Sequence, residues 1–158
     1  MIKSKILFPT LIIVSTFLLD RFSKIYILNL AENTENLNLS ITSFINIILV
    51  WNTGIGFGLF QIDDNTLYNV ITALILLINF VIIYILINSE KFQRILFSLI
   101  LGGSLGNLYD RIHYSAVPDY IDLNYNGYHW FVFNVADIFI SIGILMLILT
   151  EFLKKNEK

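Results

Sequence analysis

The chain has 158 residues and a formal net charge of −2, and 56% of its residues are hydrophobic. A soluble domain of this length would need more charge on its surface, so the composition indicates a membrane protein. The near-neutral charge gives no sign of a nucleic-acid partner, and the absence of cysteine excludes disulfides, thiol catalysis and zinc–thiolate sites. Two histidines, His113 and His129, are too few to indicate a metal site, so neither a metal nor a cofactor is expected.

The apolar residues are gathered into four long segments. A helix needs roughly 20 residues to cross a hydrocarbon core about 30 Å thick, and the segments come near that length. The predicted spans are residues 6–30, 67–88, 93–110 and 132–153. The third is the shortest of the four. We therefore expect an all-α membrane protein whose residues 1–158 form a single domain with four transmembrane helices.

The first segment carries charged residues in its second half. Asp20 and Lys24 lie four residues apart on one helical face, with the acid before the base, which is the favourable order. Two interpretations stay open: an ion pair that lowers the cost of inserting charge into the membrane, or contact with a polar substrate headgroup. Lys3 and Lys5 would also suit a cleaved signal peptide, but no small-x-small cleavage site follows the apolar run.

The loop at 31–66 contains strand-like stretches. Residues 37–42 alternate apolar and polar side chains, and 47–51 is a β-favouring run, so we expect a small antiparallel sheet here. After Asn52, glycines recur at every second position from Gly54 onward. In an extended chain these glycines would leave one face of the backbone exposed, so that a peptide could approach it closely. A simple bend into the next segment fits the same pattern.

The third and fourth segments combine small and polar residues. A glycine-rich run at 102–107 would let neighbouring helices approach closely. Asn107 and Asp110 are three residues apart, as are Asn134 and Asp137, so each pair occupies one helical face. Each asparagine could donate a hydrogen bond to its aspartate and fix its orientation. The same spacing also suits a structural network between helices.

Two features mark the end of the third segment. Asp110 is expected to offset a nearby cation such as Arg111. Farther on, Pro118 biases the chain toward an extended form, so that Asp119 projects from a stretch flanked by apolar residues. Partial desolvation there would raise the pKa of Asp119. An ordinary loop aspartate in water is the alternative.

The positive charges predict the orientation in the membrane. Lys and Arg are concentrated at the N-terminus, in the link at 89–94 and in the C-terminal tail, whereas the loop at 31–66 has none. Both termini and the middle link should therefore face the cytoplasm. Asp20 then lies roughly 21 Å along its helix, at about 1.5 Å per residue, which is in the outer half of the membrane. Asp110 and Asp137 fall at the same level, so the acidic groups converge near the outer leaflet.

Five blocks stand in order along the chain. They are Asp20-Arg21-Phe22-Ser23-Lys24, Asn52-Thr53-Gly54-Ile55-Gly56-Phe57-Gly58, Gly102-Gly103-Ser104-Leu105-Gly106-Asn107-Leu108-Tyr109-Asp110-Arg111, Val117-Pro118-Asp119-Tyr120-Ile121-Asp122 and Phe133-Asn134-Val135-Ala136-Asp137. Together they resemble the motifs of prolipoprotein signal peptidase, also called signal peptidase II. The resemblance extends from the first segment to the fourth, which is essentially the whole chain.

The resemblance implies that Asp119 and Asp137 are the catalytic pair of an aspartic endopeptidase. It implies substrate-binding or supporting roles for a further set of residues: Asn52, Gly54, Asn107, Asp110, Arg111, Asn134, Ala136, Asp20 and Lys24. It also implies four membrane helices, a small outer β-element and an interfacial helix near the site.

The same resemblance implies the substrate and the setting. The substrates would be prolipoproteins that carry diacylglycerol on a cysteine, cut just before that cysteine. The enzyme would be a monomer among the lipids of the bacterial cell membrane, and it would need no cofactor.

Four positions depart from the usual family pattern, namely Ser23, Ile55, Gly56 and Pro118. They leave the acidic residues in place and bear on the shape of the substrate groove. Two other classes of function compete with the peptidase. A transporter or channel would need a polar face on the second segment, but 70–86 is almost wholly apolar. A non-catalytic assembly factor would tolerate the loss of both aspartates.

Overall fold

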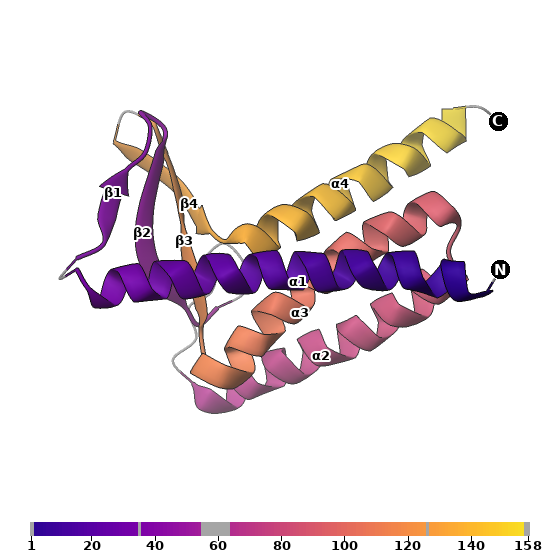
Figure 1. Ribbon diagram of the computed structural model, residues 1–158, viewed down its shortest axis with the longest axis horizontal. Helices are drawn as coiled ribbons and strands as arrows, with labels where there is room; N and C mark the ends of the chain where they lie inside the picture. The colour runs from indigo at the N-terminus through magenta and orange to yellow at the C-terminus, as the bar shows by residue number, and fades with distance from the viewer. Residues whose placement is uncertain (1, 35, 55–63, 126, 157–158) are drawn as a thin grey trace.

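The computed structural model describes residues 2–34, 36–54, 64–125 and 127–156. These residues form four long helices and one four-stranded antiparallel sheet. Figure 1 shows the helices along the long axis of the molecule and the sheet at one end. Both termini and the link between the second and third helices lie at the opposite end. The structure is mostly helical, as the sequence predicts.

The helices follow the apolar runs of the sequence. They are α1 (Ile2–Glu32), α2 (Asn65–Asn88), α3 (Lys91–Tyr114) and α4 (Val135–Asn156). Asp64 caps α2 by accepting a hydrogen bond from the Leu67 backbone N–H, which holds the pKa of its carboxyl below the ordinary value. At its other end, α3 stops at Ser115, whose φ of 56° is left-handed and turns the chain into the next strand.

Three of the described helices are long and apolar enough to cross a membrane. They are Ile6–Glu32, Asn65–Asn88 and Val135–Lys154. The predicted spans at 6–30 and 67–88 coincide with two of these helices, whereas the span predicted at 132–153 begins too early because its first residues end a strand. The predicted third span is indeed a helix, α3, but its charged residues leave it less apolar than the others. Among the residues that the structure describes, no separate interfacial helix is present.

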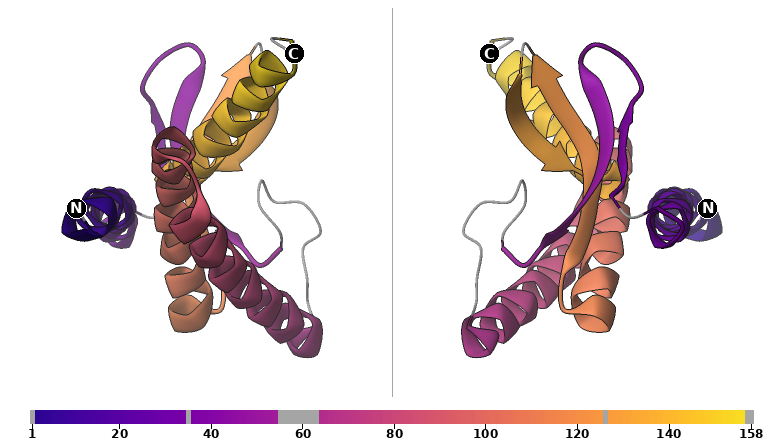
Figure 2. Two further views of the ribbon diagram at one scale, coloured as in Figure 1. Left: turned by 90° about the vertical axis from the view of Figure 1, so that its right-hand side faces the viewer. Right: turned by 90° about the vertical axis from the view of Figure 1, so that its left-hand side faces the viewer.

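Helix α3 lies at the centre of the bundle and contacts α1, α2 and α4. Figure 2 shows α1 nearly end-on, to one side of the other helices. The glycines of α3 allow these close contacts. A Cβ atom at Gly103 would lie 2.6 Å from the Ala136 carbonyl oxygen of α4, and one at Gly102 would lie 2.7 Å from Thr16 Cβ of α1. The predicted packing role of the glycine-rich run is therefore confirmed.

The sheet joins segments from both halves of the chain. Its strands are β1 (Asn38–Ser40), β2 (Ile45–Asn52), β3 (Val117–Tyr125) and β4 (Tyr128–Phe133), paired in that order. The sheet predicted in the loop at 31–66 is confirmed by β1 and β2, but β3 and β4 double its width. Val50 lies opposite Asp119 in the β2–β3 pair, and Ile27, Leu37 and Tyr120 form a small core between α1 and the sheet.

Candidate active site

Asp119 lies on β3 with almost no exposed surface. Asn52, on the neighbouring strand β2, donates a hydrogen bond from Nδ2 to Asp119 Oδ2 at 2.8 Å. Asn134 donates from its Nδ2 to Asp119 Oδ1 at 2.6 Å. Burial and the negative charge of nearby Asp137 raise the pKa of Asp119 to about 7, although the two asparagine hydrogen bonds oppose the shift. The predicted desolvation of Asp119 is confirmed, and the alternative of a solvated loop aspartate is wrong.

Asp137 lies in the first turn of α4. Its backbone N–H donates to Asn134 Oδ1, and its Oδ2 accepts from the Asn134 backbone N–H, both at 3.1 Å. This reciprocal pair is a capping box that starts the helix. Asn107, which belongs to α3, donates from its Nδ2 to Asp137 Oδ1 at 2.8 Å. The carboxylate is therefore fixed by donors from two helix regions.

One residue, Asn134, contacts both carboxyl groups. Its side-chain amide donates to Asp119, while its backbone and its amide oxygen hold Asp137. We call Asp119 and Asp137 the carboxyl pair. Every hydrogen-bond donor described for the pair is a neutral amide, and neither carboxyl forms an ion pair within the part of the chain that the structure describes.

A second group of buried charges lies beside the pair, and we call it the charged cluster: Asp20, Arg21, Lys24 and Asp110. Lys24 Nζ donates to Asp20 Oδ2 at 2.9 Å and to Asp110 Oδ2 at 2.7 Å. Arg21 Nη2 lies 2.5 Å from Asp110 Oδ1. The cluster has two acids and two bases, so its charges balance. The predicted Asp20–Lys24 ion pair is confirmed.

Asp110 offsets nearby cations, as expected, but these are Arg21 and Lys24 and not Arg111. Neighbouring residues on a helix point in different directions, so Asp110 turns toward α1 and binds Arg21 and Lys24. Arg111 instead donates from Nη2 to the Gly54 carbonyl oxygen at 2.6 Å. The Gly54 backbone N–H then donates to Asn52 Oδ1 at 2.8 Å. Arg111 thus supports the loop that orients Asn52 toward the carboxyl pair.

Asn107 joins the charged cluster to the carboxyl pair. Its Oδ1 accepts from Lys24 Nζ at 2.8 Å, which leaves its Nδ2 directed at Asp137. Of the two interpretations of the Asn107–Asp110 spacing, the network between helices is confirmed, because Asn107 bonds to α1 and across to α4 and forms no described bond with Asp110. Asp20 makes a second link, since its Oδ1 accepts from the Ala136 backbone N–H at 3.1 Å.

Sequence reasoning left out three polar partners in the sheet. Tyr120 donates from its hydroxyl to Ser23 Oγ at 2.7 Å, and burial raises the pKa of Tyr120 to about 12, so it stays a donor. Asp122 is fully buried and accepts from Asn46 at 3.1 Å, and His129 Nδ1 lies 2.7 Å from the same carboxylate. The alternation of glycines was predicted for residues 54–58. Only Gly54 is among the described residues, so Ile55, Gly56 and the rest of the alternation lie outside them.

The immediate surroundings of Asp137 are partly apolar. A cavity of about 250 Å³ is lined by Asp137 together with Phe133, Ile138, Ser141 and Ile142. Within the described ranges, no group of three or more His, Cys, Asp or Glu side chains is arranged to hold a metal ion. The arrangement offers two carboxyl groups, amide donors that orient them, and an apolar hollow beside one of them.

Comparisons with known proteins give a consistent result. The family model for signal peptidase (SPase) II matches residues 12–153. The lipoprotein signal peptidase of Pelagibacter ubique is 54% identical over 147 residues, which is 93% of this chain and 89% of that protein. The lipoprotein signal peptidase of Aquifex aeolicus is 40% identical over 148 residues, covering 91% and 85% of the two chains.

A solved structure described as a bacterial membrane enzyme, obtained by the in meso method, has a similar fold. It superposes with a TM-score of 0.80 at 28% sequence identity, and the match covers 97% of this chain and 92% of that one.

Proposed function

The chain belongs to the signal peptidase II family, and from this premise we propose that it removes signal peptides from prolipoproteins with Asp119 and Asp137 as its catalytic acids. The chain is a peptidase and a bacterial membrane protein by its family and its apolar helices. The aspartic mechanism and the recognition of the substrate lipid are the proposal. The observation that carries it is the pair of buried carboxyl groups held by one asparagine, Asn134.

The pKa of Asp119, raised to about 7, supports the acid–base role. Two carboxyl groups so close in a buried site titrate as a coupled pair, and one proton is shared between them near neutral pH. The ionised carboxylate accepts a proton from a water molecule, whose oxygen attacks the scissile carbonyl carbon. The protonated carboxyl hydrogen-bonds the carbonyl oxygen as negative charge develops there. The C–N bond then breaks, and a proton passes to the leaving amine of the lipidated cysteine.

Three asparagines keep the pair in place through this cycle. Asn52 and Asn134 each direct an N–H group at Asp119, and Asn107 directs one at Asp137. Such donors favour the ionised form of a carboxyl without neutralising it as a cation would. The pair therefore keeps the ability to exchange a proton. Asp20, Lys24, Asp110, Arg111, Gly54 and Ala136 have supporting roles in this scheme because they hold those asparagines and the start of α4.

The apolar cavity beside Asp137 supports an apolar substrate near the site. Its walls, Ile138 and Ile142 among them, would accept part of the lipid or of the signal peptide. Each buried CH₂ of a lipid contributes about 0.8 kcal/mol of membrane affinity. A diacylglyceryl group would therefore hold the precursor at the depth of the site, and the cut would fall just before the modified cysteine.

We further propose that α3 also crosses the membrane, which brings the number of spans to four. Asp110 and Arg111 lower its apolarity, but Asp110 is buried against α1, and Arg111 is buried against α2 and Gly54, which follows β2, so neither faces lipid. Four spans return the chain to its starting side, and the Lys and Arg distribution makes that side the cytoplasm. The carboxyl pair then lies near the outer leaflet. In this proposal residues 1–158 form a single domain, and the protein is a monomer surrounded by membrane lipids.

The purified chain in detergent, given a diacylglyceryl-modified precursor, tests the proposal. We expect cleavage immediately before the modified cysteine, located by mass spectrometry of the products. The same precursor without the lipid is the matched control, and it should be cleaved poorly. Equal cleavage of both forms would contradict lipid recognition, and no cleavage of either by folded protein would contradict the peptidase function itself.

A further inference from the structure

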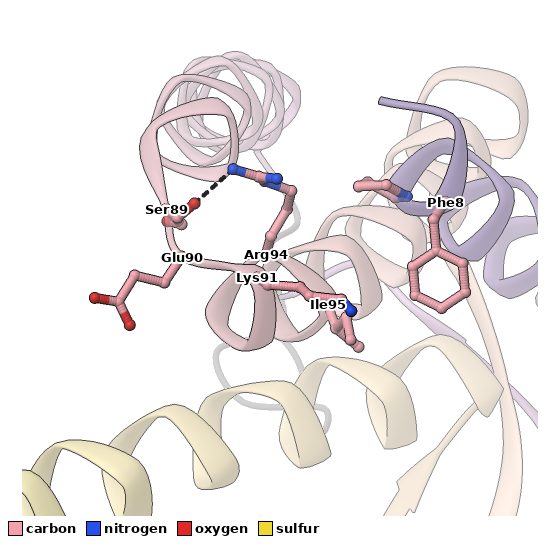
Figure 3. Close-up of a pocket in the computed structure, with 7 residues that line it drawn as sticks. Phe8, Ser89, Glu90, Lys91, Arg94 and Ile95 are labelled. Atoms are coloured by element: carbon pink, nitrogen blue, oxygen red, sulfur yellow. Dashed lines mark hydrogen bonds between the residues drawn. The ribbon is translucent and has the colours of Figure 1, made fainter. Parts of the chain in front are cut away.

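A large cavity lies at the end of the molecule that is farthest from the sheet. Its volume is about 730 Å³, and it opens where α1 passes the link between α2 and α3. Figure 3 shows Phe8 of α1 on one side and Lys91, Arg94 and Ile95 of α3 on the other. None of these residues belongs to the carboxyl pair, to the charged cluster or to the residues that support them.

The mouth of this cavity is positively charged. Arg94 donates from Nε to the Leu86 carbonyl oxygen at 3.2 Å and from Nη2 to the Ser89 carbonyl oxygen at 2.6 Å. A guanidinium group has five N–H donors, so Arg94 keeps donors for a further acceptor. Lys91 forms no ion pair with any residue that the structure describes. Glu90 also lines the cavity, but its side chain points away from Phe8 and pairs with Lys154 at 3.3 Å.

The start of α3 adds to this positive field. Glu90 is the N-cap residue, but its side chain accepts no hydrogen bond from the first turn. The first intrahelical bond is the one from the Arg94 N–H to the Glu90 carbonyl oxygen. The N–H groups before it are left without helical partners, and the helix dipole places partial positive charge at this end. Together with the two side chains, this end of α3 favours an anion.

An apolar groove continues from the same place. A second hollow of about 350 Å³ shares Pro9 and Arg94 with the first and is walled by Ile6, Ile13 and Ile87. It lies between α1 and α2, two helices that are each apolar enough to span the membrane. A free inorganic anion would gain nothing from this groove. A molecule with an anionic head and an apolar tail would fill both parts.

We propose that the cavity binds an anionic phospholipid of the leaflet into which both termini project. Its phosphate group accepts hydrogen bonds from Lys91 and Arg94 at the start of α3, and one acyl chain lies in the groove between α1 and α2. Basic pockets between membrane helices are the usual sites for anionic headgroups. The bound lipid would join α1 to the α2–α3 link, at the opposite end of the bundle from the carboxyl pair.

Binding of dioleoylphosphatidylglycerol to the full chain in detergent tests this site, with native mass spectrometry and thermal melts as readouts. Dioleoylphosphatidylcholine has the same chains without the net negative charge, and glycerol phosphate has the headgroup charge without the chains. We expect the phosphatidylglycerol to bind more tightly than either and to raise the melting temperature. Equal binding of the two lipids, or equal binding of glycerol phosphate, would overturn the proposal.

The variant Lys91→Gln locates the site. Lys91 is exposed and makes no described ion pair, so its loss should leave the fold intact. We expect binding of phosphatidylglycerol to weaken about fivefold, the equivalent of about 1 kcal/mol for one basic residue near a headgroup. Lys155→Gln, near the end of α4 and not among the residues described as lining the cavity, is the matched control and should bind like the unmodified chain. A Lys91→Gln protein that binds normally would place the lipid elsewhere and refute the assignment.

Discussion

The carboxyl pair and the charged cluster are both built from buried aspartates, but their partners differ. Asp20 and Asp110 are bound by Lys24 and Arg21, so the acids and bases of the cluster cancel. Asp119 and Asp137 are bound by the amides of asparagines, which orient a carboxylate without supplying an opposite charge. A cation beside a carboxylate strongly favours the ionised form, whereas amides and burial leave a proton within reach at neutral pH. The first arrangement suits structure, and the second suits acid–base chemistry.

Asn107 shows how the two regions depend on each other. Lys24 holds its amide oxygen, and this fixes the direction of the amide N–H toward Asp137. The charged cluster therefore orients a donor for the carboxyl pair, and the charge of Lys24 also lowers the pKa of Asp119, to a lesser extent than the asparagine hydrogen bonds do. If this division is correct, variants in the pair should lose chemistry and keep the fold, and variants in the cluster should lose stability first.

Asp119→Asn and Asp137→Asn should give the largest effect. Asparagine nearly preserves the shape of aspartate but cannot accept the proton of the attacking water. We expect each variant to lose about a thousandfold or more in cleavage rate and to stay folded. Because the two groups act as a unit, the double variant should be little worse than either single one. The measurement is cleavage rate per folded molecule, with folding checked by thermal melt.

Asp122→Asn is the matched control for this experiment. Asp122 lies on the same strand as Asp119, is equally buried and is also bound by an asparagine, but its partners are Asn46 and His129. Its substitution should leave the rate per folded molecule close to normal. If Asp122→Asn were slow and Asp119→Asn remained active, the wrong carboxyl would have been assigned to catalysis.

Asp110→Asn should act mainly on stability. The substitution leaves Arg21 and Lys24 buried with one carboxylate between them, and breaking a buried ion pair in this way costs about 3–5 kcal/mol in the free energy of unfolding. Activity should fall in step with the amount of folded protein. Detergent unfolding curves measured alongside cleavage rates separate the two quantities.

Glu90→Gln removes a carboxylate from a comparable ion pair at the surface, where Glu90 and Lys154 are largely exposed. Exposed pairs contribute about 0–1 kcal/mol, so this variant should unfold almost like the unmodified chain. A fully stable Asp110→Asn protein that has lost its activity would show that the charged cluster takes part in the chemistry.

The sequence predicted the helices better than the contacts, for a physical reason. Long apolar runs report where a chain enters a membrane, and three such runs are helices of the expected kind. Val132 and Phe133, which end β4, were assigned to the last span, although Asn126-Gly127 ahead of that strand is a strong hairpin signal. That signal, given its full weight, would have predicted β3 and β4 and shortened the last helix.

The candidate site was predicted mainly through the family resemblance. From the residues alone, Asp119 and Asp137 are separated by 18 positions, and only the return of the chain through β4 brings them to one asparagine. The capping box of Asn134 and Asp137 was available as a local pattern. The partners of Asp110 were not, because Arg21 and Lys24 belong to another helix and only tertiary packing brings them near.

Asn52→Ala should give the smallest effect. It tests directly how an amide partner, in place of a cation, acts on the pKa of Asp119. The Asn52 N–H stabilises the ionised form of Asp119 and so lowers its pKa, which burial and Asp137 have raised to about 7. Without that bond the pKa rises further, and the pair keeps its shared proton to a higher pH. The alkaline limb of the profile of kcat/KM against pH should therefore move upward by about one unit, since a hydrogen bond to a charged group contributes about 1.5–3 kcal/mol and one pKa unit is 1.36 kcal/mol.

Asn46→Ala provides the control for that shift, because Asn46 lies on the same strand and donates the same kind of bond, but to Asp122 instead of Asp119. Its alkaline limb should stay where it is. A merely structural loss at Asn52 would lower the rate at every pH without moving the limb. A limb that moves to lower pH in Asn52→Ala would mean that Asp119 does not carry the shared proton, and the distinction between the pair and the cluster would have to rest on Asp137 alone.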